Sequence, residues 1–181
     1  MLSILLMILT LGAIDTGTGA SSVVTSDVEG SYQVAAPGGT RVTPRMSGNS
    51  CSGISALDAS WILQYMVGKR ELNEFQLLAC DVTGNGSCSS LDAAKILAFT
   101  VKNIDRLPSG ELCNSDWLFV PVPFPVLGVA IEKTNPSFSE EGCVMGSVRY
   151  TDPILPLLIN GQDFTGILSG DVTGSWQPCG D

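Results

Sequence analysis

Apolar residues in the middle of the chain recur at the spacing of amphipathic helices. Two stretches, 54–68 and 88–102, each place an apolar stripe along one helical face. The stripes consist of Leu57, Ile62, Leu63, Met66 and Val67 in the first stretch, and Leu91, Ile96, Leu97 and Val101 in the second. A third helical stretch, LNEFQLLA at 72–79, joins them. The middle of the chain is therefore predicted to be helical.

The flanks instead contain short β-rich runs that are separated by glycine and proline. Ahead of the helical region these runs are SVVTS, SYQVA and TRVTP, and after Pro108 they are WLFVPVPFPVLGVAIE, GSVRYTD, PLLING and DFTGIL. Proline within several runs favours edge or irregular strands. An α+β fold is therefore expected, in which the two flanks either share a sheet layer or form separate modules.

An apolar run at residues 2–14 opens the sequence. It is shorter than the ~20 residues of a membrane-spanning helix, so no membrane span is expected. One interpretation is a signal peptide with the small residues Thr18 and Ala20 ahead of a cleavage point, although the usual basic start is missing. The other is that MILTL forms the first strand of a β-module that begins upstream. The sequence leaves both open.

The two helical stretches belong to an internal repeat. ISALDASWILQYMVG at 54–68 aligns without gaps with CSSLDAAKILAFTVK at 88–102. The identical pairs are Ser55/Ser89, Leu57/Leu91, Asp58/Asp92, Ala59/Ala93, Ile62/Ile96, Leu63/Leu97 and Val67/Val101. This density of identities predicts a duplicated loop–helix unit.

The loop of the second repeat, DVTGNGSCSSLD at 81–92, has oxygen-bearing residues at alternate positions. A hard cation such as Ca²⁺ takes about six to eight oxygen ligands, and a glycine at position 6 of a twelve-residue loop permits the sharp turn. Gly86 occupies that position. The candidate ligands are Asp81, Thr83, Asn85, the backbone carbonyl of Ser87, Ser89 and Asp92. The alternative is a plain turn, with Asp92 stabilising the helix that follows through its dipole.

The corresponding loop of the first repeat is incomplete. Ser47 replaces the first carboxylate, Cys51 occupies position 5, and Ser52 stands where glycine is expected. The candidate ligands that remain there are Asn49, Ser55 and Asp58.

A segment near the C-terminus, SGDVTGSW, repeats the opening of the complete loop. Asp171, Thr173 and Ser175 have the spacing of Asp81, Thr83 and Asn85. We therefore predict that this segment folds back and supplies the oxygens missing near Asp58, which would make a second calcium site. The alternative is a β-turn within residues 167–176.

Six cysteines, at positions 51, 80, 88, 113, 143 and 179, include no C-x-x-C pair. An even number in an acidic chain rich in glycine, serine and threonine favours structural disulfides and an extracytoplasmic location, and buried free thiols are the alternative. Cys51 and Cys88 occupy corresponding halves of the two loops. A bridge between them is one hypothesis among the many connectivities.

Charge and composition exclude several classes of function. Lys and Arg total 9 against 18 Asp and Glu, and the resulting net charge of −9 disfavours nucleic-acid partners. The chain has no histidine, which removes the usual general base and most catalytic zinc sites. The protein is therefore expected not to be an enzyme. The carboxylates that an acidic hydrolase could use, Glu140, Glu141 and Asp152, lie in stretches typical of exposed turns.

Residues 46–108 resemble the dockerin type I repeat domain. The resemblance rests on the duplicated loop–helix units, on DVTGNGSCSSLDAAKILAF, on LNEFQLLA and on the closing Leu107-Pro108. The preceding TSDVEGSYQVAAPGGTRVTP resembles the end of a carboxypeptidase-regulatory-like β-sandwich. The expected organisation is an apolar N-terminus with a partial β-sandwich at 1–45, a dockerin-like domain at 46–108 and a C-terminal β-rich segment at 109–181.

The resemblance implies calcium-dependent folding and, in cellulosome-forming bacteria, docking to a cohesin module on a scaffold. In that family small hydroxyl residues precede the closing Asp, whereas this chain has Ala56-Leu57 and Ser90-Leu91 there. The residues expected to contact a cohesin-like partner are Trp61, Tyr65, Lys69 and Lys95, with core packing as the alternative for the aromatic pair. The expected function is an extracellular or cell-surface calcium-binding docking module; the alternative is a structural spacer held by calcium and disulfides.

Overall fold

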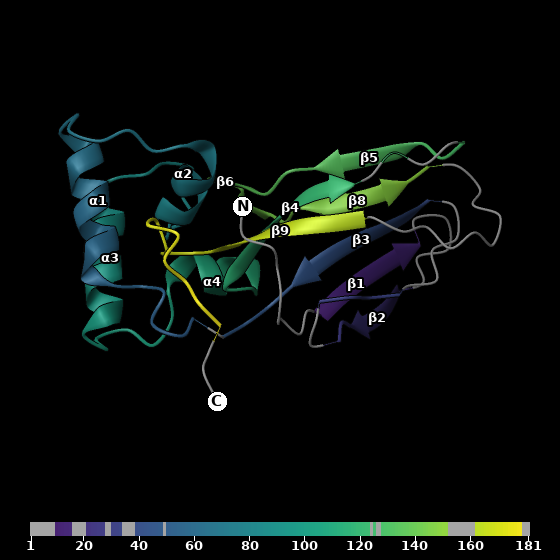
Figure 1. Cartoon of the computed structure of the whole chain (residues 1–181), viewed down its shortest axis with the longest axis horizontal. Helices are drawn as coiled ribbons and strands as arrows, with labels where there is room; N and C mark the ends of the chain where they lie inside the picture. The colour runs from purple at the N-terminus through teal and green to yellow at the C-terminus, as the bar shows by residue number, and fades with distance from the viewer. Residues whose placement is uncertain are drawn as a thin grey trace. The chain divides into compact units, whose positions relative to one another are not determined.

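The chain folds into a mixture of helices and antiparallel sheets (Figure 1), as seen in a computed structural model. The structure describes residues 10–15, 21–27, 30–33, 39–48, 50–123, 125, 128–151 and 162–178. The chain divides into two compact units. Unit 1 comprises Met1–Met46, Phe119–Pro136 and Met145–Gly166, and unit 2 comprises Ser47–Leu118, Ser137–Val144 and Ile167–Asp181.

Unit 1 contains a five-stranded antiparallel sheet with the strand order β2-β1-β3-β8-β5. The strands are β1 Thr10–Asp15, β2 Ser21–Thr25, β3 Thr40–Arg45, β5 Ile131–Thr134 and β8 Ser147–Tyr150. Strands from both flanks of the helical region thus share one sheet, which is one of the two arrangements left open by the sequence. Val42 of β3 and Val148 of β8 are register partners, and both are fully buried.

Several predicted strands of the flanks are found. TRVTP lies in β3 and SVVTS overlaps β2, but residues 31–33 of SYQVA are not in a strand. Thr10–Asp15, which begin within the opening apolar run and end one residue beyond it, form β1, which pairs with β2 and β3. The remaining residues of the signal-peptide interpretation, 1–9 and 16–20, and the run PLLING lie outside the described residues.

Unit 2 contains the described helices. They are α1 Ala56–Met66, α2 Glu74–Cys80, α3 Ser90–Thr100 and α4 Pro108–Cys113. Helices α1 and α3 pack side by side (Figure 1) through small and branched residues at equivalent places of the repeat. The buried residues of this contact are Ala59, Ile62, Ala93 and Ile96. Helix α4 was not predicted; it begins with Pro108, whose fixed φ suits a first helical turn, and its C-cap is Asn114 in the left-handed conformation.

Two strand pairs complete the described fold. Strands β4 Trp117–Pro123 and β9 Gln162–Leu168 form one pair, and β6 Ser137–Ser139 and β7 Gly142–Val144 form an antiparallel hairpin. A disulfide between Cys113 and Cys143 attaches this hairpin to the end of α4. Among the described residues, none of the helices has the length and apolar composition that crossing a membrane requires.

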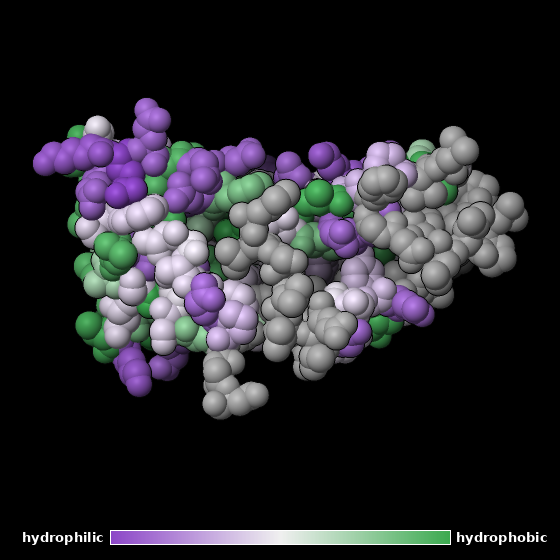
Figure 2. Space-filling view, in the orientation of Figure 1, coloured by the Kyte–Doolittle hydropathy of each residue, from purple (hydrophilic) through white to green (hydrophobic). Residues whose placement is uncertain are grey.

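The apolar stripes of α1 and α3 are mostly at the surface rather than in the core (Figure 2). The exposed residues are Leu57, Leu63, Met66, Val67, Leu91, Leu97 and Val101. Besides Asp58 and Asp92, the fully buried residues of the two helices are Ala59, Ile62, Ala93 and Ile96, whereas the leucines of each repeat are exposed. The residues of the two predicted stripes lie on α1 and α3 or at their C-caps, but only Ile62 and Ile96 among them are buried, so the periodicity did not indicate which of them are covered.

Candidate metal centres

The loop between α2 and α3 is organised around the carboxylate of Asp81. Asp81 Oδ1 accepts hydrogen bonds from the backbone N–H groups of Gly84, at 2.8 Å, and Asn85, at 3.1 Å, and Oδ2 accepts one from Gly86 N–H at 2.7 Å. Gly84 and Gly86 have φ of +74° and +87°, a region that glycine enters without strain. The first half of the loop therefore folds around this carboxylate.

The carboxylate of Asp92 closes the other half of the loop. Its Oδ1 accepts from the backbone N–H of Thr83 at 2.9 Å, and its Oδ2 accepts from the backbone N–H of Ser89 at 2.8 Å. The hydroxyl oxygen of Thr83 lies 2.8 Å from Asp92 Oδ1 and 3.3 Å from Asp81 Oδ1. Oxygens from three of the predicted ligands thus converge within one loop.

A second, equivalent cluster is assembled from two distant parts of the chain. The backbone N–H and the hydroxyl of Thr173 both donate to Asp58 Oδ1 at 2.8 Å, across 115 positions of sequence. Asp58 Oδ2 accepts from the backbone N–H of Ser55 at 2.8 Å and from its hydroxyl at 3.0 Å. The C-terminal segment thus lies against Asp58, as the repeat of DVTG predicted.

Most contacts of the two clusters correspond. Asp171 takes the role of Asp81: it accepts from the backbone N–H groups of Ser175 and Trp176, each at 2.9 Å, and its Oδ1 lies 3.2 Å from the hydroxyl oxygen of Thr173. The correspondence pairs Asp171 with Asp81, Thr173 with Thr83, Ser175 with Asn85, Asp58 with Asp92 and Ser55 with Ser89. One difference is that Trp176 stands where the complete loop has its turn glycine. We call these the contiguous loop (81–92) and the split loop (55–58 with 171–176).

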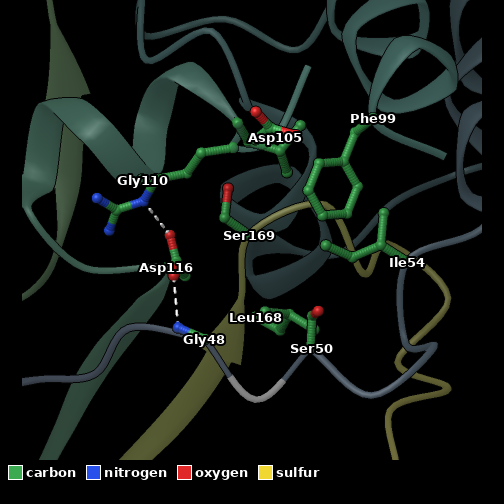
Figure 3. A pocket seen from close by; sticks show the side chains of 11 residues that line it. Gly48, Ser50, Ile54, Phe99, Asp105, Gly110, Asp116, Leu168 and Ser169 are labelled. Atoms are coloured by element: carbon green, nitrogen blue, oxygen red, sulfur yellow. Dashed lines mark hydrogen bonds and ion pairs between the residues drawn. The ribbon is translucent and has the colours of Figure 1, made fainter. Parts of the chain in front are cut away.

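The start of the first repeat's loop is held by Asp116 and Trp117, away from Asp58 (Figure 3). The backbone N–H of Gly48 donates to Asp116 Oδ2 at 2.6 Å, while Asp116 Oδ1 is paired with Arg106 Nε at 2.6 Å. The carbonyl of Gly48 accepts from the Trp117 indole N–H at 3.1 Å. The segment before Cys51 is therefore drawn toward Asp116, and residues 171–176 occupy the place beside Asp58. Asn49, one of the predicted ligands, lies outside the described residues.

All four carboxylates of the two loops are buried, with at most 8 % of the residue exposed. The ion pairs among the described residues join Arg106 to Asp116 and Arg149 to Glu132, so they leave these four without a basic partner in that part of the chain. Burial raises the pKa of Asp81, and the nearby Asp92 raises it further, while backbone N–H donors oppose the shift. The pKa of Asp171 is raised by burial and by Asp58 in the same way.

The donor chemistry of both loops fits a hard divalent cation. Each loop brings two carboxylates together with threonine and serine or asparagine oxygens, which are ligands that calcium accepts. Within the described residues there is no cluster of three or more His, Cys, Asp and Glu that could hold a metal. Neutral oxygens would thus have to complete the coordination of each pair of carboxylates. Asn85 Oδ1 at present accepts from the backbone N–H of Ser87 at 2.9 Å.

The disulfides differ from the one bridge suggested by the sequence. Cys88 is bonded to Cys80, with 5.4 Å between their Cα atoms, so the hypothesis of a Cys51–Cys88 bridge is wrong. Cys80 is the last residue of α2 and Cys88 directly precedes Ser89, the N-cap of α3. The bridge is thus made within one loop rather than between the two. Cys51 is also disulfide-bonded, and the described residues include no free cysteine.

The residues predicted to contact a partner lie on or directly after α1 and α3. Lys69 is exposed, Tyr65 and Lys95 are half-buried, and Trp61 has the Arg70 guanidinium 3.6 Å above its ring centroid. The sequence did not indicate that the leucines of these helices form an exposed surface. Leu57 and Leu91, directly before the closing aspartates, are 55 % and 53 % exposed. The sequence feature that could have indicated this surface is the apolar stripe along each of the two helical stretches.

Two of the three carboxylates considered for hydrolysis lie in the described part of the chain. Glu140 and Glu141 are exposed in the turn between β6 and β7, as predicted for that stretch, and Asp152 lies outside the described residues. Comparisons with known proteins found no matching family model and no significantly similar curated protein or solved structure.

Proposed function

We propose that this chain is a non-catalytic, dockerin-like module that binds two calcium ions and serves in protein docking or anchoring outside the cell. The observation that carries the proposal is the repeated cluster of two buried carboxylates and a bridging threonine, present in the contiguous and the split loop. A cluster of this kind occurring twice, once by local and once by long-range contacts, is difficult to explain as an accident of turn geometry.

Electrostatics supports a dication as the occupant. The two buried carboxylates of each loop have no basic partner in the part of the chain that the structure describes. Their charge is unfavourable in a low-dielectric interior, and a bound dication would compensate for it. The donors are all oxygens, which favours calcium or magnesium over zinc or copper. Calcium is the better candidate because loops tolerate its variable geometry, whereas magnesium demands a near-ideal octahedron.

The outer surface of α1 and α3 supports a docking role. Seven large apolar side chains are exposed there, more than the scattered surface residues expected of a monomer. The acidic residues of these two helices, Asp58 and Asp92, are both buried, so Lys95 is the one charged residue within α1 and α3 that is not buried. The exposed Lys69 follows α1, two positions before the exposed Glu71. In a chain of net charge −9, this surface suits a cohesin-like partner with an apolar patch and acidic rim.

The decisive test is a calorimetric titration of metal-stripped protein with calcium. We expect two ions per chain, and one ion in each of the matched variants Asp92→Asn and Asp58→Asn. Helical circular dichroism recorded alongside reports whether the variants remain folded. Absence of binding in the unmodified protein, with native circular dichroism, would contradict the proposal. A single ion that only Asp92→Asn abolishes would limit it to the contiguous loop.

A structural spacer is the second candidate, favoured by the disulfides that tie α2 to α3 and α4 to β7. The two roles differ in what the exposed leucines do. For docking, replacing Leu57 and Leu91 with Asp should abolish retention of a secreted or cell-surface partner on immobilised protein. For a spacer, unmodified and Leu→Asp proteins should retain the same background, and both should keep calcium affinity.

A further inference from the structure

The Cys80–Cys88 disulfide closes a ring around the first half of the contiguous loop. We propose that this disulfide sets the calcium affinity of the loop, so that calcium binding there depends on the oxidation state of the pair. The inference rests on the proposed calcium binding and adds a means of regulation to it. Cys80 and Cys88 act as positioning residues, since their sulfurs are not ligands in this scheme.

The position of the bridge connects it to the ligands. Four of the six candidate ligands lie inside the ring: Asp81, Thr83, Asn85 and Ser87. The bridge also joins the last residue of α2 to the residue before the N-cap of α3. It therefore limits how far Asp81, which follows α2, can move from Asp92 in the first turn of α3.

A separate contact supports the loop from outside the ring. A side chain at Gly84 would meet Leu112 of α4 at 2.8 Å and Phe138 of β6 at 3.4 Å, and one at Gly86 would meet the Phe138 carbonyl at 3.0 Å. The β6–β7 hairpin thus packs on the glycines of the loop, and the Cys113–Cys143 bridge attaches that hairpin to α4. Because this packing does not use Cys80 or Cys88, we expect the fold to survive loss of their bond.

Reduction of the bridge by a dithiol is the step that would lower affinity. Cys80 is fully buried and Cys88 is half-buried, so the thiolate of the dithiol is expected to attack Cys88 Sγ and displace the Cys80 thiolate, which takes up a proton. The second thiol of the reductant then displaces Cys88. Two electrons and two protons pass to the protein, and the dithiol becomes a cyclic disulfide. The opened loop gains conformational freedom that calcium binding must then remove.

The first experiment compares calcium binding in Asp58→Asn with binding in Asp58→Asn carrying Cys80→Ala and Cys88→Ala. The Asp58 change removes the split loop's ion, so the isotherm reports the contiguous loop alone. We expect affinity to fall roughly tenfold, within the range typical of coupling between two sites. Equal affinities would overturn the inference. Absence of calcium binding in both, and in the unmodified protein, would instead refute the proposed function.

The second experiment uses the unmodified protein and needs no folded cysteine variant. By reciprocity, calcium should protect the bridge from reduction by the same factor by which the bridge favours calcium. Reduction at a fixed dithiol potential, followed by alkylation and peptide mass mapping, measures the Cys80–Cys88 pair separately from the others. We expect roughly tenfold less reduced pair at equilibrium when calcium saturates the loop, consistent with that coupling. Protection that is absent, or that persists in Asp92→Asn, would overturn the inference.

Discussion

At the scale of single residues, each loop is organised around an aspartate whose carboxylate accepts hydrogen bonds from uncharged groups. Each of Asp81 and Asp171 accepts backbone N–H groups from its own turn, and each lies beside a second buried carboxylate. The hydrogen bonds favour the charged form, but burial and the neighbouring charge disfavour it more, so both pKa values are raised. Protons and calcium should therefore compete for these residues.

This competition predicts how the stability of the calcium-free protein varies with pH. Because the pKa values of Asp81 and Asp171 are higher in the folded than in the unfolded chain, their contribution to stability is present below the ordinary Asp pKa. It is lost as pH rises through the raised values. We expect calcium to increase Tm most at neutral pH and least in acid, as measured by calorimetry with calcium or a chelator.

A matched variant isolates these two groups from the other titrating carboxylates. In Asp81→Asn/Asp171→Asn the uncharged amides cannot titrate, so the difference in Tm between this variant and the unmodified protein, both calcium-free, should grow in the variant's favour as pH rises. A difference that does not change with pH, or that shrinks, would show that these pKa values are not raised.

At the scale of elements, α1 and α3 are near copies that pack through a narrow set of residues. Both start with a serine N-cap whose hydroxyl and backbone N–H contact the aspartate three positions later. Their buried positions, Ile62 and Ile96, are fully inaccessible, whereas the adjacent Leu63 and Leu97 are 46 % and 40 % exposed. Neighbouring residues of similar volume thus have opposite environments within one helix turn.

Because these isoleucines are buried and the adjacent leucines are exposed, truncation to alanine should lower the stability of the fold by different amounts at the two kinds of position. Ile62→Ala or Ile96→Ala should lower the free energy of unfolding by about 2–5 kcal/mol, because each leaves a cavity in the helix contact. Leu63→Ala or Leu97→Ala should lower it by less than about 1 kcal/mol, as is usual for exposed positions. Urea unfolding of calcium-saturated protein measures both. Similar losses for the two pairs would mean that the leucines are covered in solution.

At the scale of the whole molecule, segments far apart in sequence build each compact unit. In unit 2 the C-terminal segment returns to α1 and places Trp176 against Gly53, with the Trp176 and Trp117 rings in an edge-to-face contact at 5.0 Å. Val172 is fully buried, and its carbonyl accepts from the Gln76 side chain at 3.0 Å. The split loop therefore depends on this docking as well as on its own carboxylates.

Gly53 offers a test of the docking in which none of the proposed ligand residues is substituted. A Cβ at Gly53 would lie 2.9 Å from Cβ and Cδ1 of Trp176, so Gly53→Ala should displace the tryptophan and with it residues 171–175. We expect calorimetry to find one calcium ion instead of two, with the affinity of the contiguous loop unchanged. Retention of two ions at unchanged affinity would show that the split loop tolerates movement of the segment.

Several parts of the fold could be predicted from patterns among residues close together in the sequence. The contiguous loop and the turn at Glu140-Glu141 follow from spacing and residue type, because their contacts join residues a few positions apart. Strand β3 follows from its own residue types, although its pairing partners β1 and β8 lie far along the chain. Other features depend on competition between distant partners. The Cys80–Cys88 pairing and the exposure of Leu57 and Leu91 are examples, since equivalent positions in the repeat made a different bridge and a buried leucine equally reasonable.

The sequence by itself determined the duplicated loop–helix units, the oxygen-rich composition of the loops and the matching DVTG segment near the C-terminus. Its spacing suggested that this segment lies beside Asp58 and left a plain β-turn as the alternative. The tertiary structure decided between the two, and it alone showed that Gly48 is held by Asp116. The physical reason is that contacts across 115 positions depend on the packing of Val172 and Trp176 and on the competing Arg106–Asp116 pair. The spacing of residues along the chain does not show which of these long-range contacts will form.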